Sequence, residues 1–125
     1  MLKSTAPILS VKRLALCVLI VSCLAVPASA QNQLDIALGE LSEILGALSH
    51  LEEVCARTSF ARDDMQSLLA NDSLSEVRQS ILIDAFNRGF RGAATTHHTC
   101  TSSSERLIDR HQQRGADIVA SLLDG

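Results

Sequence analysis

The sequence contains no tryptophan and no tyrosine, and three phenylalanines make up all of its aromatic content. A binding surface built on tryptophan or tyrosine is therefore excluded. Basic side chains are also scarce, because residues 31–125 carry eight arginines and no lysine against 14 acidic residues, a formal net charge of −6. Affinity for nucleic acid rests on neutralising phosphates, so this balance argues against a nucleic-acid partner. It argues equally against simple adsorption to an anionic membrane.

The N-terminal segment lacks an apolar run long enough to cross a membrane. A basic leader precedes the apolar run Leu14–Val26, and the small residues Ala28-Ser29-Ala30 follow Pro27. These three regions in this order mark a secretory signal peptide. A spanning helix needs about 20 apolar residues, which disfavours an uncleaved anchor. We expect residues 1–30 to be a signal peptide cleaved between Ala30 and Gln31, and residues 31–125 to be one periplasmic domain that does not span the membrane.

A lipoprotein signal is the alternative for the same segment. The stretch "IVSC", Ile20–Cys23, resembles a bacterial lipobox, whose cysteine would carry the lipid. The residues after Cys23 stay apolar up to Pro27, and Ala-Ser-Ala follows where ordinary cleavage takes place. We therefore favour the periplasmic protein and keep lipid attachment at Cys23 as the second interpretation.

Cleavage would leave only two cysteines, Cys55 and Cys100. Two cysteines in a small exported domain most simply form one disulfide. Closing a loop of this length stabilises a protein by about 4 kcal/mol in the chain-entropy model. This is a large share of the roughly 5–15 kcal/mol that holds a small domain folded.

Apolar periodicity predicts an all-α fold, a small bundle of about four mostly antiparallel helices. Residues 34–55 place apolar or small side chains at alternating steps of three and four, a stripe wide enough for a bundle core. A short second helix follows a cap at Thr58 or Ser59. A third starts near Leu74 behind the capping box Ser73–Glu76, and a fourth follows a cap at Thr101 or Ser102. We expect Val77 and Ile81 on the inner side of the third helix, and His111, Val119 and Leu123 on that of the fourth.

The expected disulfide makes a geometric prediction. It brings the ends of the first and third helices together, so these helices should run roughly parallel. Eleven residues make nearly whole turns of a helix, so Gly89 lies on the face of Cys100, and Ile44 lies on the face of Cys55. Gly89 should therefore face the region of Ile44 and Leu48 and let the two backbones approach.

A second stripe of small residues runs along the first helix and includes Gly39 and Gly46. Each glycine inside a helix costs about 1 kcal/mol relative to alanine. The simpler interpretation is a tolerated solvent-facing side. The alternative is a docking surface for a partner helix or for a second copy of the chain, which would make a homodimer.

The stretch "THHTC" is the strongest candidate for chemistry. His97, His98 and Cys100 are too few and too crowded for a structural zinc site, which needs four ligands. A nucleophilic thiolate needs a free cysteine, and Cys55 competes for Cys100. The acidic pairs Glu52-Glu53 and Asp63-Asp64 look like exposed helix residues. No catalytic motif is present, so we expect no enzyme activity, no metal and no cofactor.

Several arginines could contact a partner or ligand. Arg106, Arg110 and Arg114 lie four residues apart, which is typical of a solvated face; the alternative is a docking strip for an acidic partner. Asn87 and Arg91 share a helix face, as contact with an anion requires, although such an arginine more often makes an internal salt bridge.

Four stretches, in this order behind a signal peptide, resemble a family of small exported α-proteobacterial proteins without assigned function. They are "LSEILGALSHLEEVC", "ARDDMQSLL", "ILIDAFNRGFRGA" and "CTSSSERLI". The family pattern includes two paired cysteines and FN-x-G-[FY]-R, and the resemblance covers nearly all of the mature chain. The family also has tryptophan and tyrosine where this chain has none. The resemblance implies an exported helical protein and supplies no activity.

Together these features predict an exported helical protein that binds a protein or an envelope component and is not an enzyme. A small-ligand or metal-binding protein that uses His97, His98, His111 or Arg91 is the alternative. A thiol enzyme using Cys100 is a third hypothesis.

Overall fold

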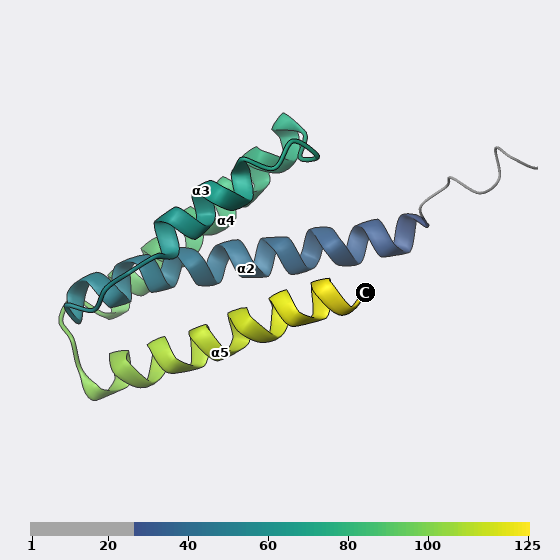
Figure 1. Ribbon diagram of the computed structural model, residues 1–125. Coiled ribbons are helices and arrows are strands. Elements are labelled where there is room, and N and C mark those ends of the chain that lie inside the picture. The colour runs from purple at the N-terminus through teal and green to yellow at the C-terminus, as the bar shows by residue number, and fades with distance from the viewer. Residues whose placement is uncertain (1–26) are drawn as a thin grey trace, which may run out of the picture. The chain divides into compact units, whose positions relative to one another are not determined.

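A computed structural model describes residues 27–125, and every regular element in this range is an α-helix. The helices are α2 (Ala28–Val54), α3 (Ala61–Leu69), α4 (Glu76–Thr96) and α5 (Ser102–Asp124), drawn in Figure 1. The chain divides into the units Met1–Asn32 and Gln33–Gly125, and the helical fold is that of the second. The all-α prediction with about four helices and one disulfide is confirmed.

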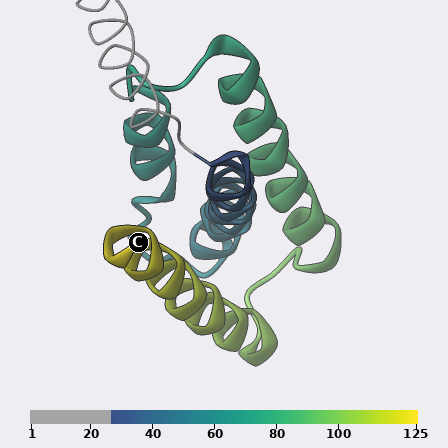
Figure 2. The ribbon, with the colours of Figure 1, turned by 90° about the vertical axis from the view of Figure 1, so that its right-hand side faces the viewer.

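Helix α2 lies at the centre, with α3, α4 and α5 arranged around it (Figure 2). This position follows from its wide apolar stripe, because a helix that is apolar on most of its sides is stable only when other elements cover it. Leu51 is completely buried, and Ile44 and Leu48 are 6% exposed. Ile108 and Ile118 supply the share of α5 in the same core.

Helices α2 and α4 run in the same general direction toward the disulfide, as expected, while α5 returns the opposite way (Figure 1). A Cβ on Gly89 would lie 1.8 Å from the Glu43 carbonyl oxygen and 3.1 Å from the Ala47 amide nitrogen. Gly89 therefore faces the backbone of α2 within one turn of the predicted position, and the close approach is confirmed.

Two of the predicted caps differ in the structure. The N-cap of α4 is Ser75, whose side chain accepts from the Arg78 amide, whereas Ser73 bonds to Asn71. The N-cap of α3 is Phe60, without a side-chain cap. The Thr101 cap is confirmed, and it forms a capping box with Ser104.

Some apolar residues expected on inner faces are exposed. Helix α4 packs on α2 through a row of mostly small residues, and Val77 and Ile81 lie to the side of that row with 70% and 56% of their surface exposed. Val119 and Leu123 of α5 are 42% and 81% exposed. Helix α5 packs mainly on α2 (Figure 2), so both of its flanks stay partly open. The row of α4 residues is Leu82, Ala85, Gly89 and Ala93.

The signal-peptide and lipobox predictions fall on residues outside the described range, apart from the cleavage site. Ala30 and Gln31 lie in the first turn of α2. Export and cleavage therefore stay predictions. No helix within residues 27–125 is both long and apolar enough to cross a membrane.

Candidate functional site

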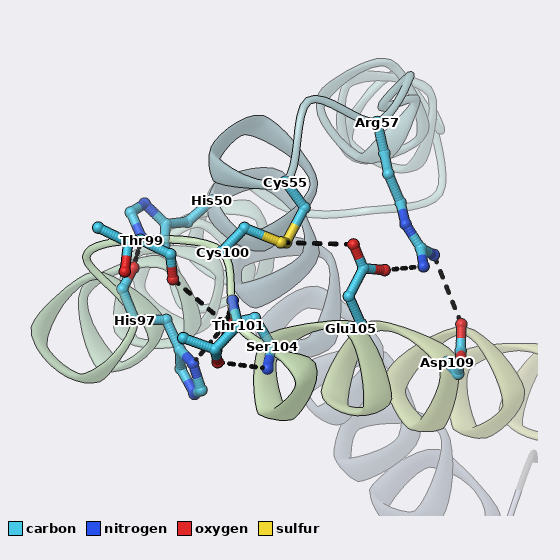
Figure 3. Close-up of a disulfide and its surroundings, with 10 residues drawn as sticks. All are labelled: His50, Cys55, Arg57, His97, Thr99, Cys100, Thr101, Ser104, Glu105 and Asp109. Carbon is cyan, nitrogen blue, oxygen red and sulfur yellow. Dashed lines mark hydrogen bonds and ion pairs between the residues drawn. A yellow bond between two sulfur atoms is a disulfide. The ribbon is translucent and has the colours of Figure 1, made fainter.

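The disulfide between Cys55 and Cys100 forms the joint at one end of the bundle (Figure 3). Cys55 directly follows α2, and Cys100 lies in the linker between α4 and α5, with the two Cα atoms 4.8 Å apart. Ala56 adopts a positive φ of 53°, which turns the chain sharply after Cys55. The predicted pairing is confirmed, and it fixes the end of α2 against the start of α5.

The histidine-rich stretch holds the linker in place. His50 donates a hydrogen bond through Nε2 to the His97 carbonyl oxygen at 2.8 Å, and His97 Nδ1 lies 3.0 Å from the Ser104 hydroxyl (Figure 3). Ser104 is completely buried and also closes the capping box of α5. His97 therefore connects α2 to the start of α5, while His98 is exposed on the surface.

Chemistry at Cys100 is limited by its bond to Cys55. Cys55, Cys100 and Glu105 place potential metal-ligand atoms within 4.8 Å of one another. The two sulfurs are bonded to each other, so of the three only the Glu105 carboxylate could ligate a metal. That carboxylate already forms an ion pair with Arg57. Neither a metal thiolate nor a nucleophilic thiolate is available at this joint while the disulfide is intact.

The structure separates the two glycines of the small-residue stripe. Gly46 is buried, and a Cβ there would lie 1.9 Å from the Phe86 carbonyl oxygen of α4. It belongs to an internal helix contact, so both interpretations of the stripe, a solvent-facing side and a docking surface for an external partner, are wrong at Gly46. Nothing lies within 4 Å of a Cβ built on Gly39, which lines an open groove.

The three arginines of the row on α5 differ in their contacts. Arg114 makes a two-pronged ion pair with Glu40 of α2, Nε to Oε1 at 2.6 Å and Nη2 to Oε2 at 2.8 Å. This hydrogen bonding lowers the pKa of Glu40 and raises that of Arg114. Arg106 and Arg110 are exposed and form no ion pair within residues 27–125.

Asn87 and Arg91 lie on the exposed side of α4. Neither residue lines the grooves described below, and the structure does not bring them to a common site with the α5 arginines. The internal salt bridge of this region is made instead by Arg88, which pairs with Glu43 at 3.5 Å.

A groove lies on each side of α5, with α2 as the floor of both. The α4-side groove has a volume of about 650 Å³, and Gly39, Gly92 and His111 are among the residues that line it. The α3-side groove has a volume of about 500 Å³, and its walls are mainly apolar side chains of α2 and α5. His111 borders both grooves, and its burial, followed by the charge of Arg110, lowers its pKa.

A smaller pocket of about 150 Å³ extends the α3-side groove toward the start of α3. Glu52, Phe60 and Asp64 line it, and sequence analysis did not select any of them as site residues. The expectation of an exposed Glu52 is wrong, since only 6% of its surface is accessible. The available signal was its position in the middle of the apolar stripe, four residues after Leu48.

The carboxyl group of Glu52 titrates under opposing influences. Burial raises its pKa above the ordinary 4.5, the positive charge of Arg57 partly offsets this, and the negative charge of Asp64 adds to the rise. Arg57 makes its contacts elsewhere, with Glu105 and Asp109.

Neither the curated proteins nor the solved structures contain a significant match to this chain. A family model described as "Protein of unknown function (DUF2385)" matches residues 34–124, from the start of the apolar stripe of α2 to the end of α5. The match includes most of α2, the whole of the other three helices, both cysteines and all residues of the two grooves. The chain therefore belongs to the family of proteins of unknown function DUF2385.

Proposed function

We propose that this protein is exported to the periplasm and acts there as a binding module without enzymatic activity. The observation that carries the proposal is the open position of α5. Its inner side packs on α2, with Gly115 near Ile44 and Leu41, while a groove remains on each flank. Two grooves of about 500 and 650 Å³ fall in the range of ligand-binding sites, which is roughly 300–1,000 Å³.

The absence of catalysis is part of this proposal. Cys100, the candidate nucleophile, is bonded to Cys55, and its histidine neighbour His97 is hydrogen-bonded to Ser104. The three carboxylates of the α4-side groove, Asp35, Glu40 and Glu43, are paired with arginines, so none is prepared as a general base.

Export is tested by the intact mass of the protein from the envelope fraction under denaturing, non-reducing conditions. We expect a chain that begins at Gln31 and is lighter by two hydrogens than the reduced form. A retained N-terminal segment, or a lipid on Cys23, would contradict periplasmic release and move the protein to a membrane anchor.

Binding is tested by filling the grooves. Gly39→Leu and Gly92→Leu place side chains in the α4-side groove, where a Cβ on either glycine meets nothing within 4 Å. Val119→Gln places a polar side chain in the α3-side groove. We expect envelope components that copurify with the native protein to be lost with one of these variants.

The matched control is Asn87→Ala together with Arg91→Ala on the outer side of α4. If copurification depends on these residues or on Arg106 and Arg110, and not on groove filling, the grooves are not the binding surface. Identical stability of all variants, measured by thermal unfolding, separates loss of binding from loss of fold.

A further inference from the structure

The α3-side groove is lined by apolar side chains along most of its length, and its polar residues lie at one end. The apolar side chains of this groove come from both α2 and α5. Val119 and Leu123 keep 42% and 81% of their surface exposed beside it. The polar end consists of Asp64, His111 and Gln112. The apolar residues include Leu41, Leu45, Leu48, Ala116, Val119 and Leu123.

The small pocket with Glu52 continues this groove. The two spaces adjoin, because four residues line both of them: Leu45, Leu48, Asp64 and Gln112. The pocket adds a second carboxylate, Glu52, and the aromatic ring of Phe60. An apolar space of about 500 Å³ thus ends in a space of about 150 Å³ that carries two negative charges.

Glu52 forms no hydrogen bond or salt bridge within residues 27–125, although the positive charge of Arg57 acts on it from a distance. Only 6% of its surface is accessible, and its carboxylate oxygens, which no protein donor in this range contacts, still reach solvent. The nearby guanidinium of Arg57 is held by Glu105 and Asp109. A buried carboxylate is normally paired, because burial of an unpaired charge is unfavourable. Burial raises the pKa of Glu52, the charge of Arg57 partly offsets the rise, and the charge of Asp64 adds to it.

Phe60 supports the same interpretation from the other wall. It is 63% exposed, precedes α3 as its N-cap and lines the same small pocket as Glu52 and Asp64. An aromatic ring attracts cations through the negative charge density of its face. Two carboxylates and a ring around one small space are a favourable environment for an ammonium group.

The α4-side groove provides the contrast. Each of its acidic side chains is paired within the chain, Asp35 with Arg78, Glu40 with Arg114 and Glu43 with Arg88. No buried carboxylate remains there without a partner in the described chain. The two grooves therefore differ in charge although they are similar in size.

We propose that the α3-side groove binds a small amphipathic organic cation, with its ammonium group between Glu52 and Asp64 and its apolar chain along α2 and α5. This inference rests on the proposed function, for which it names the ligand class of one groove. The ammonium group gives the Glu52 carboxylate a partner, and the chain covers the exposed apolar side chains of α5.

The test uses the oxidised protein from the envelope fraction and three probes at neutral pH: octylammonium, octanoate and methylammonium. Isothermal titration calorimetry and amide chemical shifts report affinity and location. We expect octylammonium to bind at least ten-fold more tightly than either other probe, with shifts in α2, α3 and α5. The apolar chain explains the preference over methylammonium, and the carboxylates explain the preference over octanoate.

Variants assign the two halves of the site. Glu52→Gln and Asp64→Asn should each weaken octylammonium binding ten-fold or more, and Val119→Gln should weaken it without strengthening methylammonium. Glu40→Gln in the other groove is the matched control and should change nothing. Glu52→Gln preserves the shape of the side chain and removes a charge that makes no hydrogen bond or salt bridge in the described chain, so loss of folding is not expected.

Equal affinity for octanoate and octylammonium would overturn the proposal, because the groove would then select only apolar chains. Absence of octylammonium binding, or binding insensitive to Glu52→Gln, would also overturn it. The proposed function fails separately: its test is the loss of copurified components on groove filling, and that result can hold even when octylammonium does not bind.

Discussion

Gly46 and Gly89 lie on facing sides of the crossing between α2 and α4, each against the backbone of the other helix. A Cβ on Gly46 would lie 1.9 Å from the Phe86 carbonyl oxygen, and one on Gly89 would lie 1.8 Å from the Glu43 carbonyl oxygen. Real Cβ atoms do not approach so closely. The spacing of the two helices is therefore set by the absence of two side chains.

This relationship predicts opposite effects at four glycines. Gly46→Ala or Gly89→Ala should lower the free energy of unfolding by about 1–3 kcal/mol, because the helices must separate. Gly39→Ala and Gly92→Ala add a methyl group in open space and should raise it by about 0.5–1 kcal/mol through helix propensity. Urea denaturation of the oxidised protein measures all four. Equal stabilities would contradict the close crossing.

Removal of the disulfide should destabilise the domain strongly. The bond closes a loop with a sequence separation of 45 residues, and the double variant Cys55→Ser with Cys100→Ser should lose about 4 kcal/mol. Thermal unfolding with and without reductant provides the measurement, and the double variant should not respond to the reductant. A loss below about 1 kcal/mol would indicate that the disulfide contributes little beyond the packed core.

Glycine in the turn after α2 should stabilise the protein. Ala56 has a φ of 53°, where a Cβ is unfavourable. The Arg57 amide donates to the Glu52 carbonyl oxygen and the Ala56 amide to that of Glu53, as in a helix C-terminal turn. Ala56→Gly should raise the free energy of unfolding by about 1 kcal/mol. Ala70→Gly is the matched control at the end of α3, where φ is −74°, and it should lower stability. Equal effects of the two variants would argue against strain at Ala56.

Replacement of Glu52 should change the dependence of stability on pH. Its folded pKa lies above the ordinary 4.5, so the unfolded chain loses the proton first as the pH rises. Ionisation of Glu52 therefore lowers stability above pH 4.5, and the loss is complete once the pH exceeds the folded pKa. Glu52→Gln should be more stable than the native protein at neutral pH, and the difference should vanish below pH 4.5. A constant difference across this range would exclude a shifted Glu52.

His111 should change the dependence of stability on pH in the direction opposite to that of Glu52. Burial, followed by the charge of Arg110, lowers its pKa below the ordinary 6.5, so the unfolded chain takes up the proton first as the pH falls. Stability is then full above pH 6.5 and decreases as the pH falls toward the folded pKa. The difference in stability between the native protein and His111→Gln should show this decrease, and thermal unfolding at several pH values measures it. No pH dependence of the difference would place His111 in contact with water.

The helices could be predicted from the sequence because their signals are local. The steps of three and four along residues 34–55 specify an amphipathic helix, and Thr101 caps the next residues whatever the rest of the chain does. The pairing of Cys55 with Cys100 followed from the count of cysteines in the mature chain. These inferences need only residue types and their spacing.

Only the tertiary structure decided which surfaces are free. Gly39 and Gly46 lie on one stripe of α2, but α4 crosses at Gly46 and leaves Gly39 open, and no local signal specifies where two helices cross. Glu52 resembles its neighbour Glu53 in sequence, yet packing buries the first and exposes the second. The pocket of Glu52, Phe60 and Asp64 arises because α3 and α5 meet α2 from different sides, a long-range arrangement that depends on the whole packed core.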